Sequence, residues 1–250
     1  MTMDTLVELL KRADACEKDL PPLLPVQELP RALEIAAWID HTLLKPEATA
    51  VQVRSLCEEA RQHRFAAVCV NPSYVPLAVG LLAGSKVAVC TVVGFPLGAC
   101  LPSYKTFEAL ACLEAGAVEI DMVLNIGALK GQAYGQVLNE ILMLAQVVHN
   151  QRALLKVIFE TSLLTQREKI MACLLSQAAG ADFVKTSTGF STGGATVADV
   201  ELMRRMVGSG MGVKASGGVR TYSEALGMIR AGATRIGTSA GIRILQEAQL

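Results

Sequence analysis

Two lysines each lie inside an apolar run of the kind that forms a buried β-strand. Lys185 lies in the segment DFVKTSTG, and Lys214 lies in GVKASGG, about one strand-and-helix unit further along. A buried lysine resists its positive charge, and a second ammonium nearby lowers the pKa of such a group further. The neutral amine that results can attack a carbonyl near neutral pH. Lys185 and Lys214 are therefore both candidates to form a Schiff base.

A carboxylate interrupts another apolar run. Asp121 lies in EIDMV, where a strand of a parallel sheet is expected to be hydrophobic on both faces. One interpretation is structural, because a lysine that neutralises a buried carboxylate also perturbs pKa values. With two lysines expected in the same region, an acid/base role for Asp121 is favoured. Lys156, in the apolar run LLKV, is expected instead to extend its ammonium into water.

Small, turn-forming residues follow both lysines and recur near the end of the chain. The segments TG (188–189), GGVR (217–220) and GTSAG (237–241) are predicted to present backbone N–H groups around an anion. Loops after the last two strands of a barrel are a recurrent phosphate site, which fits the second and third segments. The alternative is that Gly217 and Gly218 only make a tight turn.

The elements that must position these residues alternate along the chain. Helical patterns separate short β-type runs at the spacing of strand-and-helix units, and several helices end in Ala-Gly-Ala, a glycine cap. The pattern predicts an α/β protein with a single (β/α)8 TIM barrel. A doubly wound open sheet is the alternative, but no G-x-G-x-x-G follows the first strand and no Walker A sequence occurs. The predicted strands are 38–40, 66–70, 86–93, 117–124, 154–159, 182–185, 212–214 and 235–237, and the predicted helices are 51–63, 103–115, 134–149, 165–179, 196–207 and 223–231.

The segment before the first predicted strand has its own pattern. Helical spacing covers 5–17, prolines at 21, 22 and 25 interrupt it, and a second amphipathic stretch covers 28–37. We therefore expect an N-terminal helical extension, residues 1–37, followed by a barrel domain, residues 38–250.

Composition excludes several classes of function. The 23 basic and 23 acidic residues of the 250 leave no net field to attract nucleic acid or an anionic membrane. No apolar run is long enough to span a bilayer, and the N-terminus does not resemble a signal peptide. Seven cysteines without a C-x-x-C pair indicate reduced thiols in the cytoplasm. Three histidines in separate elements give no support for zinc, so we expect neither a metal nor a cofactor.

Seven segments in order, spread over residues 39–244, resemble the deoxyribose-phosphate aldolases, a family of class I, metal-independent aldolases with a (β/α)8 fold. Besides the two lysine segments these are IDHTLLKP (39–46), VCVNP (68–72), VGFPLG (93–98), EIDMV (119–123) and LKVIFET (155–161). The resemblance implies reversible cleavage of 2-deoxy-D-ribose 5-phosphate into D-glyceraldehyde 3-phosphate and acetaldehyde. These small phosphorylated sugars and aldehydes are the expected partners, together with a homo-oligomeric assembly.

By this resemblance Lys185 corresponds to the Schiff-base lysine, and Asp121 and Lys214 correspond to the residues that move protons around it. Phe190 stands where some members carry a lysine near the phosphate, so anion binding should depend more on backbone amides. The chain ends at Leu250 without the tyrosine that some members fold toward the site. Residues that match pocket or phosphate positions are Asp40, Thr42, Cys69, Gly189, Gly217, Gly218, Gly237 and Ser239, with Arg220 as a further candidate.

Two alternatives stay open. The same barrel and lysine fit another sugar phosphate, as in a transaldolase-like enzyme. The other alternative is not an enzyme but a phosphate-binding barrel without catalytic activity, although a binding protein has no need for two buried lysines facing an aspartate.

Overall fold

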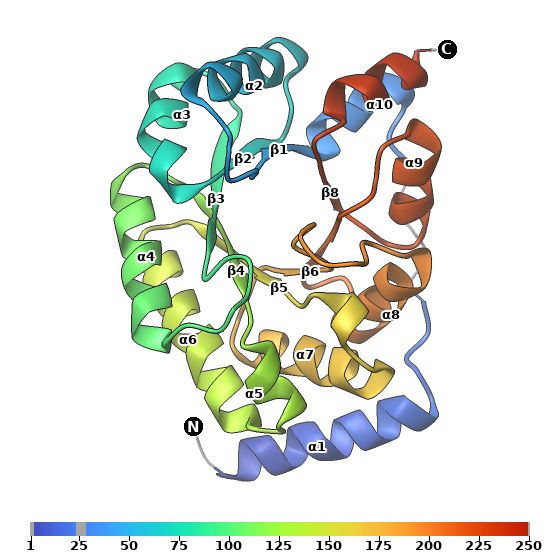
Figure 1. Ribbon diagram of the computed structural model, residues 1–250. Helices are drawn as coiled ribbons and strands as arrows, with labels where there is room; N and C mark the ends of the chain where they lie inside the picture. The colour runs from blue at the N-terminus through green and yellow to red at the C-terminus, as the bar shows by residue number, and fades with distance from the viewer. Residues whose placement is uncertain (1–2, 24–28, 250) are drawn as a thin grey trace.

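Eight parallel strands form a closed barrel in sequence order, with the last strand paired to the first (Figure 1). The computed structural model describes residues 3–23 and 29–249. The predicted (β/α)8 barrel is therefore confirmed. The strands are β1 (Ile39–Leu43), β2 (Ala67–Val70), β3 (Ala88–Val93), β4 (Glu119–Val123), β5 (Leu154–Ile158), β6 (Phe183–Lys185), β7 (Gly212–Ser216) and β8 (Arg235–Thr238).

Helices surround the barrel, and local sequence explains where several of them begin and end. Thr49, Thr165 and Thr221 each form a capping box that satisfies free N–H groups at a helix start. The Ala-Gly-Ala segments adopt the left-handed turns expected of glycine, as at Gly116 with φ 101°. The α-helices are α2 (Ala50–His63), α3 (Val75–Leu82), α4 (Pro102–Glu114), α5 (Ile126–Lys130), α6 (Tyr134–Asn150), α7 (Gln166–Ala178), α8 (Val197–Val207), α9 (Tyr222–Arg230) and α10 (Gly241–Ala248), and the 3-10 helices are η1 (Ala32–Trp38), η2 (Pro72–Tyr74) and η3 (Thr161–Leu163).

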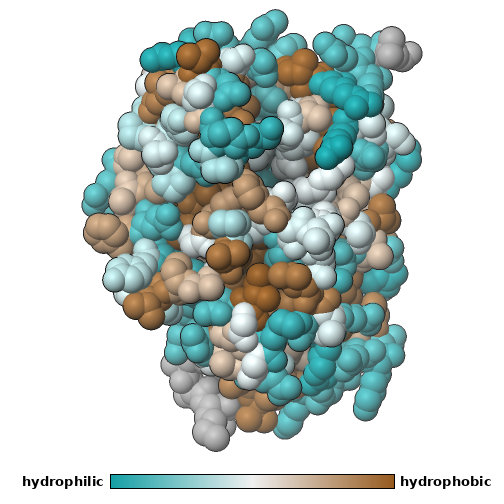
Figure 2. Space-filling model, in the orientation of Figure 1, coloured by the Kyte–Doolittle hydropathy of each residue, from teal (hydrophilic) through white to brown (hydrophobic). Residues whose placement is uncertain are grey.

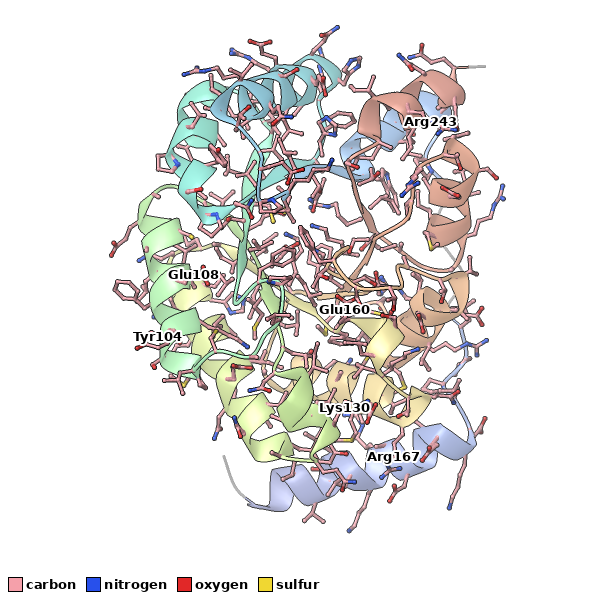
Figure 3. All side chains as sticks on the ribbon, viewed as in Figure 1. Tyr104, Glu108, Lys130, Glu160, Arg167 and Arg243 are labelled. Carbon is pink, nitrogen blue, oxygen red and sulfur yellow. The ribbon has the colours of Figure 1, made fainter. Side chains whose placement is uncertain are left out.

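The N-terminal helix α1 (Met3–Lys18) packs across α7 on the outside of the barrel (Figure 1). Leu9 and Ala13 are buried in this contact, and Arg167 of α7, labelled in Figure 3, forms ion pairs with Asp14 and Glu17. In the predicted amphipathic stretch 28–37, the structure has the 3-10 helix η1 in place of a regular α-helix. Pro25 and Glu28 lie outside the described residues. The division into residues 1–37 and 38–250 stays a prediction.

The barrel has two kinds of core. Apolar residues fill the space between the strands and the helices, as in other barrels. Inside the barrel, a small apolar cluster occupies the side of β2 and β3, with Ala67, Cys69, Cys90 and Val92 as members. The rest of the interior holds charged side chains from β1, β4, β5, β6, β7 and β8. Within the described residues, no helix is long and apolar enough to cross a membrane.

Candidate active site

Asp121 is the centre of the charged interior. Its Oδ2 lies 2.7 Å from Nζ of Lys185 and 2.8 Å from Nζ of Lys214, and its Oδ1 lies 2.8 Å from Nζ of Lys156. The three lysines come from the consecutive strands β5, β6 and β7, and their side chains all point into the barrel toward Asp121 of β4. Lys156 stands beside Asp121 in the register of β4 and β5, whereas Lys185 and Lys214 come from strands further round the barrel. All three catalytic candidates, Lys185, Asp121 and Lys214, are in direct contact.

A second set of carboxylates extends this network toward β1 and β8. Lys214 also forms an ion pair with Asp40, and Asp40 accepts a hydrogen bond from Arg235 at 2.6 Å. Glu119 lies 2.6 Å from Nζ of Lys156 and 3.4 Å from the Arg235 guanidinium. The interior therefore holds four cationic side chains and three carboxylates, a surplus of one positive charge if all are ionised.

The lysines and carboxylates set each other's ionisation. Burial opposes the charge of Asp121, but the surrounding lysines outweigh burial and hold the pKa of this carboxyl well below its usual range. Burial likewise opposes the charge of Lys214, but the carboxylates of Asp121 and Asp40 outweigh it and raise its pKa. Lys214 thus stays a cation beside the carboxylate oxygen that it shares with Lys185.

These shifts predict how stability depends on pH. A carboxylate whose pKa is depressed by folding stabilises the protein above its unfolded value, about pH 4, and loses that contribution as the pH falls toward the folded value. We therefore expect the free energy of unfolding to fall below about pH 4. Urea titrations between about pH 5 and pH 2 measure this slope, and Asp121→Asn should make it shallower. A slope unchanged by the substitution would contradict the assignment of the depressed pKa to Asp121.

The expectation for Lys156 was wrong. Its side chain is fully buried, and its ammonium contacts Glu119 and Asp121 rather than water. The apolar neighbours of Lys156 lie on the helix-facing side of β5, whereas Lys156 itself points into the barrel, where opposite charges compensate it. Glu119 and Arg235 were not predicted as part of the site, although Glu119 stands two residues before Asp121 and must share its face of the strand.

Replacing Lys156 by methionine should lower stability substantially. The change leaves Glu119 in the barrel without its nearest cation, and removing one partner of a buried pair costs about 3–5 kcal/mol. Urea unfolding of Lys156→Met measures the loss. The matched control is Lys86→Met, because Lys86 is exposed and its removal should change stability by less than about 0.5 kcal/mol. Equal losses in the two variants would contradict the buried network.

A pocket of about 440 Å³ opens above this network at the carboxyl ends of β1, β6, β7 and β8. Lys185 lines it, whereas Lys214, Asp121 and Lys156 are not among its described lining residues. The predicted binding residues that line the pocket are Thr42, Gly189, Gly217, Gly218, Arg220, Gly237 and Ser239.

Two predicted pocket residues lie elsewhere. Asp40 is fully buried beneath the pocket, where it joins Lys214 to Arg235. Cys69 is fully buried on β2, paired in register with Cys90 of β3. The structure therefore brings Asp40 into the charged network, and it places the Cys69 thiol within 4.8 Å of the Asp121 carboxylate, at the border between that network and the apolar cluster and outside the pocket lining.

The turn after β7 needs its glycines. Gly217 and Gly218 have φ of 88° and 84°, which side chains other than glycine rarely adopt. Gly194 approaches the same turn so closely that a Cβ there would lie 2.3 Å from the Gly217 carbonyl oxygen. The tight-turn interpretation thus holds, and the same turn also lines the pocket beside Arg220.

Glu160, labelled in Figure 3, supports the neighbouring loop after β6. It is buried, has a φ of 57°, and accepts hydrogen bonds from the backbone N–H and the hydroxyl of Thr188. Thr188 in turn lines the pocket and accepts a hydrogen bond from the N–H of Phe190 at 3.1 Å. Residues in strained backbone regions are often found at functional sites. The positive φ of Glu160 is such a signal, and it is visible in the structure but not in the sequence.

Comparison with known proteins shows the family to which the chain belongs. A model described as DeoC/LacD family aldolase matches residues 35–247. The chain belongs to the DeoC/LacD aldolase family.

Relatives within this aldolase family match most of the chain. The deoxyribose-phosphate aldolase of Streptococcus gordonii is 58% identical over 214 residues, which is 86% of this chain and 96% of the relative. That of Thermococcus gammatolerans is 57% identical over 219 residues, 87% of this chain and 97% of the relative. The resemblance inferred from seven segments is thus confirmed, and the protein is an aldolase.

Solved structures of aldolases have the same fold as this chain. A crystal structure from Coccidioides immitis, of a protein provisionally assigned as a deoxyribose-phosphate aldolase, superposes with a TM-score of 0.91 at 42% identity and covers 97% of both chains. The deoxyribose phosphate aldolase of Aeropyrum pernix, described as tetrameric, has a TM-score of 0.83 at 36% identity and covers 88% of this chain and 93% of its own. Aldolases of this family therefore share the fold that positions Asp121 and the three lysines.

Proposed function

We propose that this aldolase reversibly cleaves 2-deoxy-D-ribose 5-phosphate into D-glyceraldehyde 3-phosphate and acetaldehyde, with Lys185 as the Schiff-base lysine. We assign the Schiff base to Lys185, rather than to Lys156 or Lys214, because of its position at the pocket. Three lysines contact Asp121, and among them Lys185 lines the pocket that the glycine turns share. A substrate in the pocket therefore meets Lys185 before the other two.

The charges around Lys185 favour its role as a nucleophile. Attack on a carbonyl requires the neutral amine. Lys185 and Lys214 share Oδ2 of Asp121, so their two ammoniums repel, and loss of one proton removes the surplus positive charge of the network. Because its pKa is raised, Lys214 keeps its own proton and stays a positive charge beside Lys185.

The cleavage then follows from the imine. Lys185 attacks the C1 aldehyde of the open-chain sugar, and loss of water gives a protonated imine that acts as an electron sink. The C2–C3 bond breaks, its electron pair forms the enamine at C1–C2, and the C3 hydroxyl loses its proton to become the aldehyde of glyceraldehyde 3-phosphate. Protonation of the enamine at C2 and hydrolysis of the imine then release acetaldehyde and free Lys185.

Asp121 and Lys214 are proposed to move the protons in these steps, with a water as the relay. Asp121 lies 2.7 Å from Nζ of Lys185, within reach of a proton at the reacting centre. Its depressed pKa means that the carboxylate passes a proton on rather than holding it. Lys214 supplies the positive charge that stabilises an oxygen as its proton leaves.

The phosphate is proposed to bind at the turns after β6, β7 and β8. Gly189, Gly217, Gly218, Gly237 and Ser239 line this part of the pocket, and Arg220 adds a positive charge. Phe190 contributes an aromatic wall in place of a lysine, so backbone N–H groups carry most of the contact with the anion.

A comparison of three sugars tests this proposal. We expect cleavage of 2-deoxyribose 5-phosphate, a KM at least about tenfold higher for unphosphorylated 2-deoxyribose, and no cleavage of fructose 6-phosphate. Release of each product aldehyde, followed with coupled dehydrogenases, gives the rates. Efficient cleavage of fructose 6-phosphate would favour a transaldolase-like enzyme, and binding without turnover of any sugar would favour a non-catalytic barrel.

Assembly and location belong to the same proposal. We propose that the enzyme works as a homo-oligomer in the cytoplasm. The tetrameric relative from Aeropyrum pernix supports the first statement. The seven cysteines of this chain are free thiols, five of them buried on helices or strands, and they fit the second.

A further inference from the structure

The loop after β6 carries part of the proposed phosphate site but no charged side chain. Residues 186–198, which follow Lys185, contain no charged residue, and most of them are serine, threonine or glycine. Figure 2 shows mostly pale and brown residues near the middle of the view, where this loop lies in Figure 1. An anion held by this loop must therefore be held by backbone N–H groups, and the direction of those groups decides how well it is held.

Two of three consecutive N–H groups in this loop already have acceptors. The N–H of Thr188 donates to Glu160 at 3.2 Å, and the N–H of Phe190 donates to the Thr188 hydroxyl at 3.1 Å. Between them, the N–H of Gly189 donates to no acceptor within the described residues, and Gly189 lines the pocket with a φ of 84°. The N–H of Gly189 is therefore the one of the three that is available to an anion.

Glu160 orders this arrangement. Its Oε2 accepts both the N–H and the hydroxyl of Thr188, while its Oε1 is buried without a hydrogen-bond partner in the part of the chain that the structure describes. An ionised carboxylate only accepts hydrogen bonds, so the Thr188 hydroxyl donates to it and keeps its lone pairs for the Phe190 N–H. Hydrogen bonds to a charged acceptor are about twice as strong as those between neutral groups. Glu160 thus fixes Thr188, and Thr188 fixes Phe190.

The charge of Glu160 lies behind the pocket rather than in it. Glu160 is 2% exposed and is not among the described lining residues, whereas Thr188 lines the pocket. A carboxylate on the pocket wall would repel a phosphate, because like charges repel strongly where water is excluded. Behind Thr188, the carboxylate can order the loop without meeting the anion.

The turn after β7 holds the same loop from the other side. The N–H of Ala195 donates to the Gly217 carbonyl oxygen at 2.9 Å, and the Ser216 hydroxyl donates to the Ser187 carbonyl oxygen at 2.6 Å. Strand β6 lies between β5, which ends just before Glu160, and β7. A shift of the loop at Glu160 would therefore also disturb the turn that contains Gly217.

We propose that Glu160 is a positioning residue for the phosphate end of the pocket, and that it acts by holding Thr188 so that the N–H of Gly189 faces the anion. This inference rests on the proposed function, because it takes a phosphorylated sugar as the substrate. Among the described residues, Glu160 forms no hydrogen bond or ion pair with Lys185 or Asp121. Its effect should therefore fall on the binding of the phosphate and not on the chemistry of the imine.

Steady-state kinetics of Glu160→Gln with 2-deoxyribose 5-phosphate and with unphosphorylated 2-deoxyribose test the proposal. For the phosphorylated sugar we expect KM to rise about fivefold to tenfold with kcat within about threefold, because an amide holds Thr188 less firmly than a carboxylate does. For the unphosphorylated sugar, kcat/KM should stay within about twofold. A general loss of structure would lower the rates for both sugars alike, and a thermal melt monitors the fold.

Thr188→Val removes the hydroxyl that joins Glu160 to the loop. It should lower the preference for the phosphorylated sugar by a similar factor. The double variant Glu160→Gln/Thr188→Val should lose no more than about twofold beyond Thr188→Val, since both changes break the same contact.

Glu168→Gln is the matched control. Glu168 accepts the N–H of another threonine, Thr165, at 2.8 Å, outside the pocket lining, and glutamine fills the same capping role. This variant should keep the preference for the phosphorylated sugar within about twofold.

Three outcomes would overturn the positioning role while leaving the proposed reaction in place. They are equal losses for the two sugars in Glu160→Gln, an unchanged KM for the phosphorylated sugar, and independent losses that add in the double variant. If Glu160→Gln does not fold, Thr188→Val decides, and an unchanged preference for the phosphorylated sugar in that variant overturns the role. If the protein without substitutions cleaves both sugars equally well, the phosphate site itself is wrong, and this inference fails with it.

Discussion

Replacing Lys185 by arginine should reduce cleavage of 2-deoxyribose 5-phosphate by at least about 10⁴-fold, because a guanidinium cannot form the imine. The positive charge beside Asp121 is kept, so folding should be preserved. Coupled detection of glyceraldehyde 3-phosphate measures the rate, and circular dichroism with a thermal melt measures the fold.

Lys130→Arg is the control for this variant. Lys130 is an exposed lysine that pairs with Glu168 at 3.0 Å, so the same chemical change there should leave the rate within about twofold. Substantial activity in folded Lys185→Arg protein would mean that another lysine, with Lys214 as the next candidate, is the nucleophile.

Asp121→Asn should affect both stability and turnover. The neutral amide cannot compensate the three ammoniums around it, and an uncompensated buried charge costs about 3–5 kcal/mol. Loss of the carboxylate that passes protons should lower kcat by roughly 10²- to 10⁴-fold. Urea unfolding measures the first effect, and steady-state kinetics under native conditions measures the second.

Two further variants separate these effects. Glu119→Gln removes a buried carboxylate that contacts Lys156 but not Lys185, so it should destabilise the protein with a much smaller loss of kcat. Asp199→Asn removes a carboxylate that pairs with one lysine, Lys169, outside the barrel at 2.5 Å, and should cost about 1 kcal/mol. If Glu119→Gln lowered kcat as much as Asp121→Asn, Asp121 would have no special role in proton transfer.

The strands could be predicted from sequence because each is a short apolar run followed by a turn signal. All eight predicted runs overlap an observed strand, and their ends coincide with those of the strand or differ by at most three residues. Three helices were not predicted, for different reasons. The segment of α3 is apolar on all sides and contains a proline and a glycine, α5 is five residues long, and α10 follows the last strand without a marked cap.

The charged interior could be predicted only in part. Lys185, Asp121 and Lys214 stand out because each interrupts an apolar run, and the structure places them in contact. Lys156 interrupts such a run as well, yet its burial depends on Glu119 and Asp121 of the neighbouring strand, and register between strands is not written in a local pattern. The hydrogen bonds of Glu160 to Thr188 likewise depend on contacts between two loops.

Borohydride reduction in the presence of acetaldehyde, followed by peptide mass mapping, tests the Schiff-base lysine most directly. Reduction converts an imine into a stable amine on the lysine that formed it. We expect a two-carbon adduct on Lys185. An adduct on Lys214 or Lys156 with Lys185 unmodified would contradict it, because the lysine that lines the pocket would then not be the one that reacts.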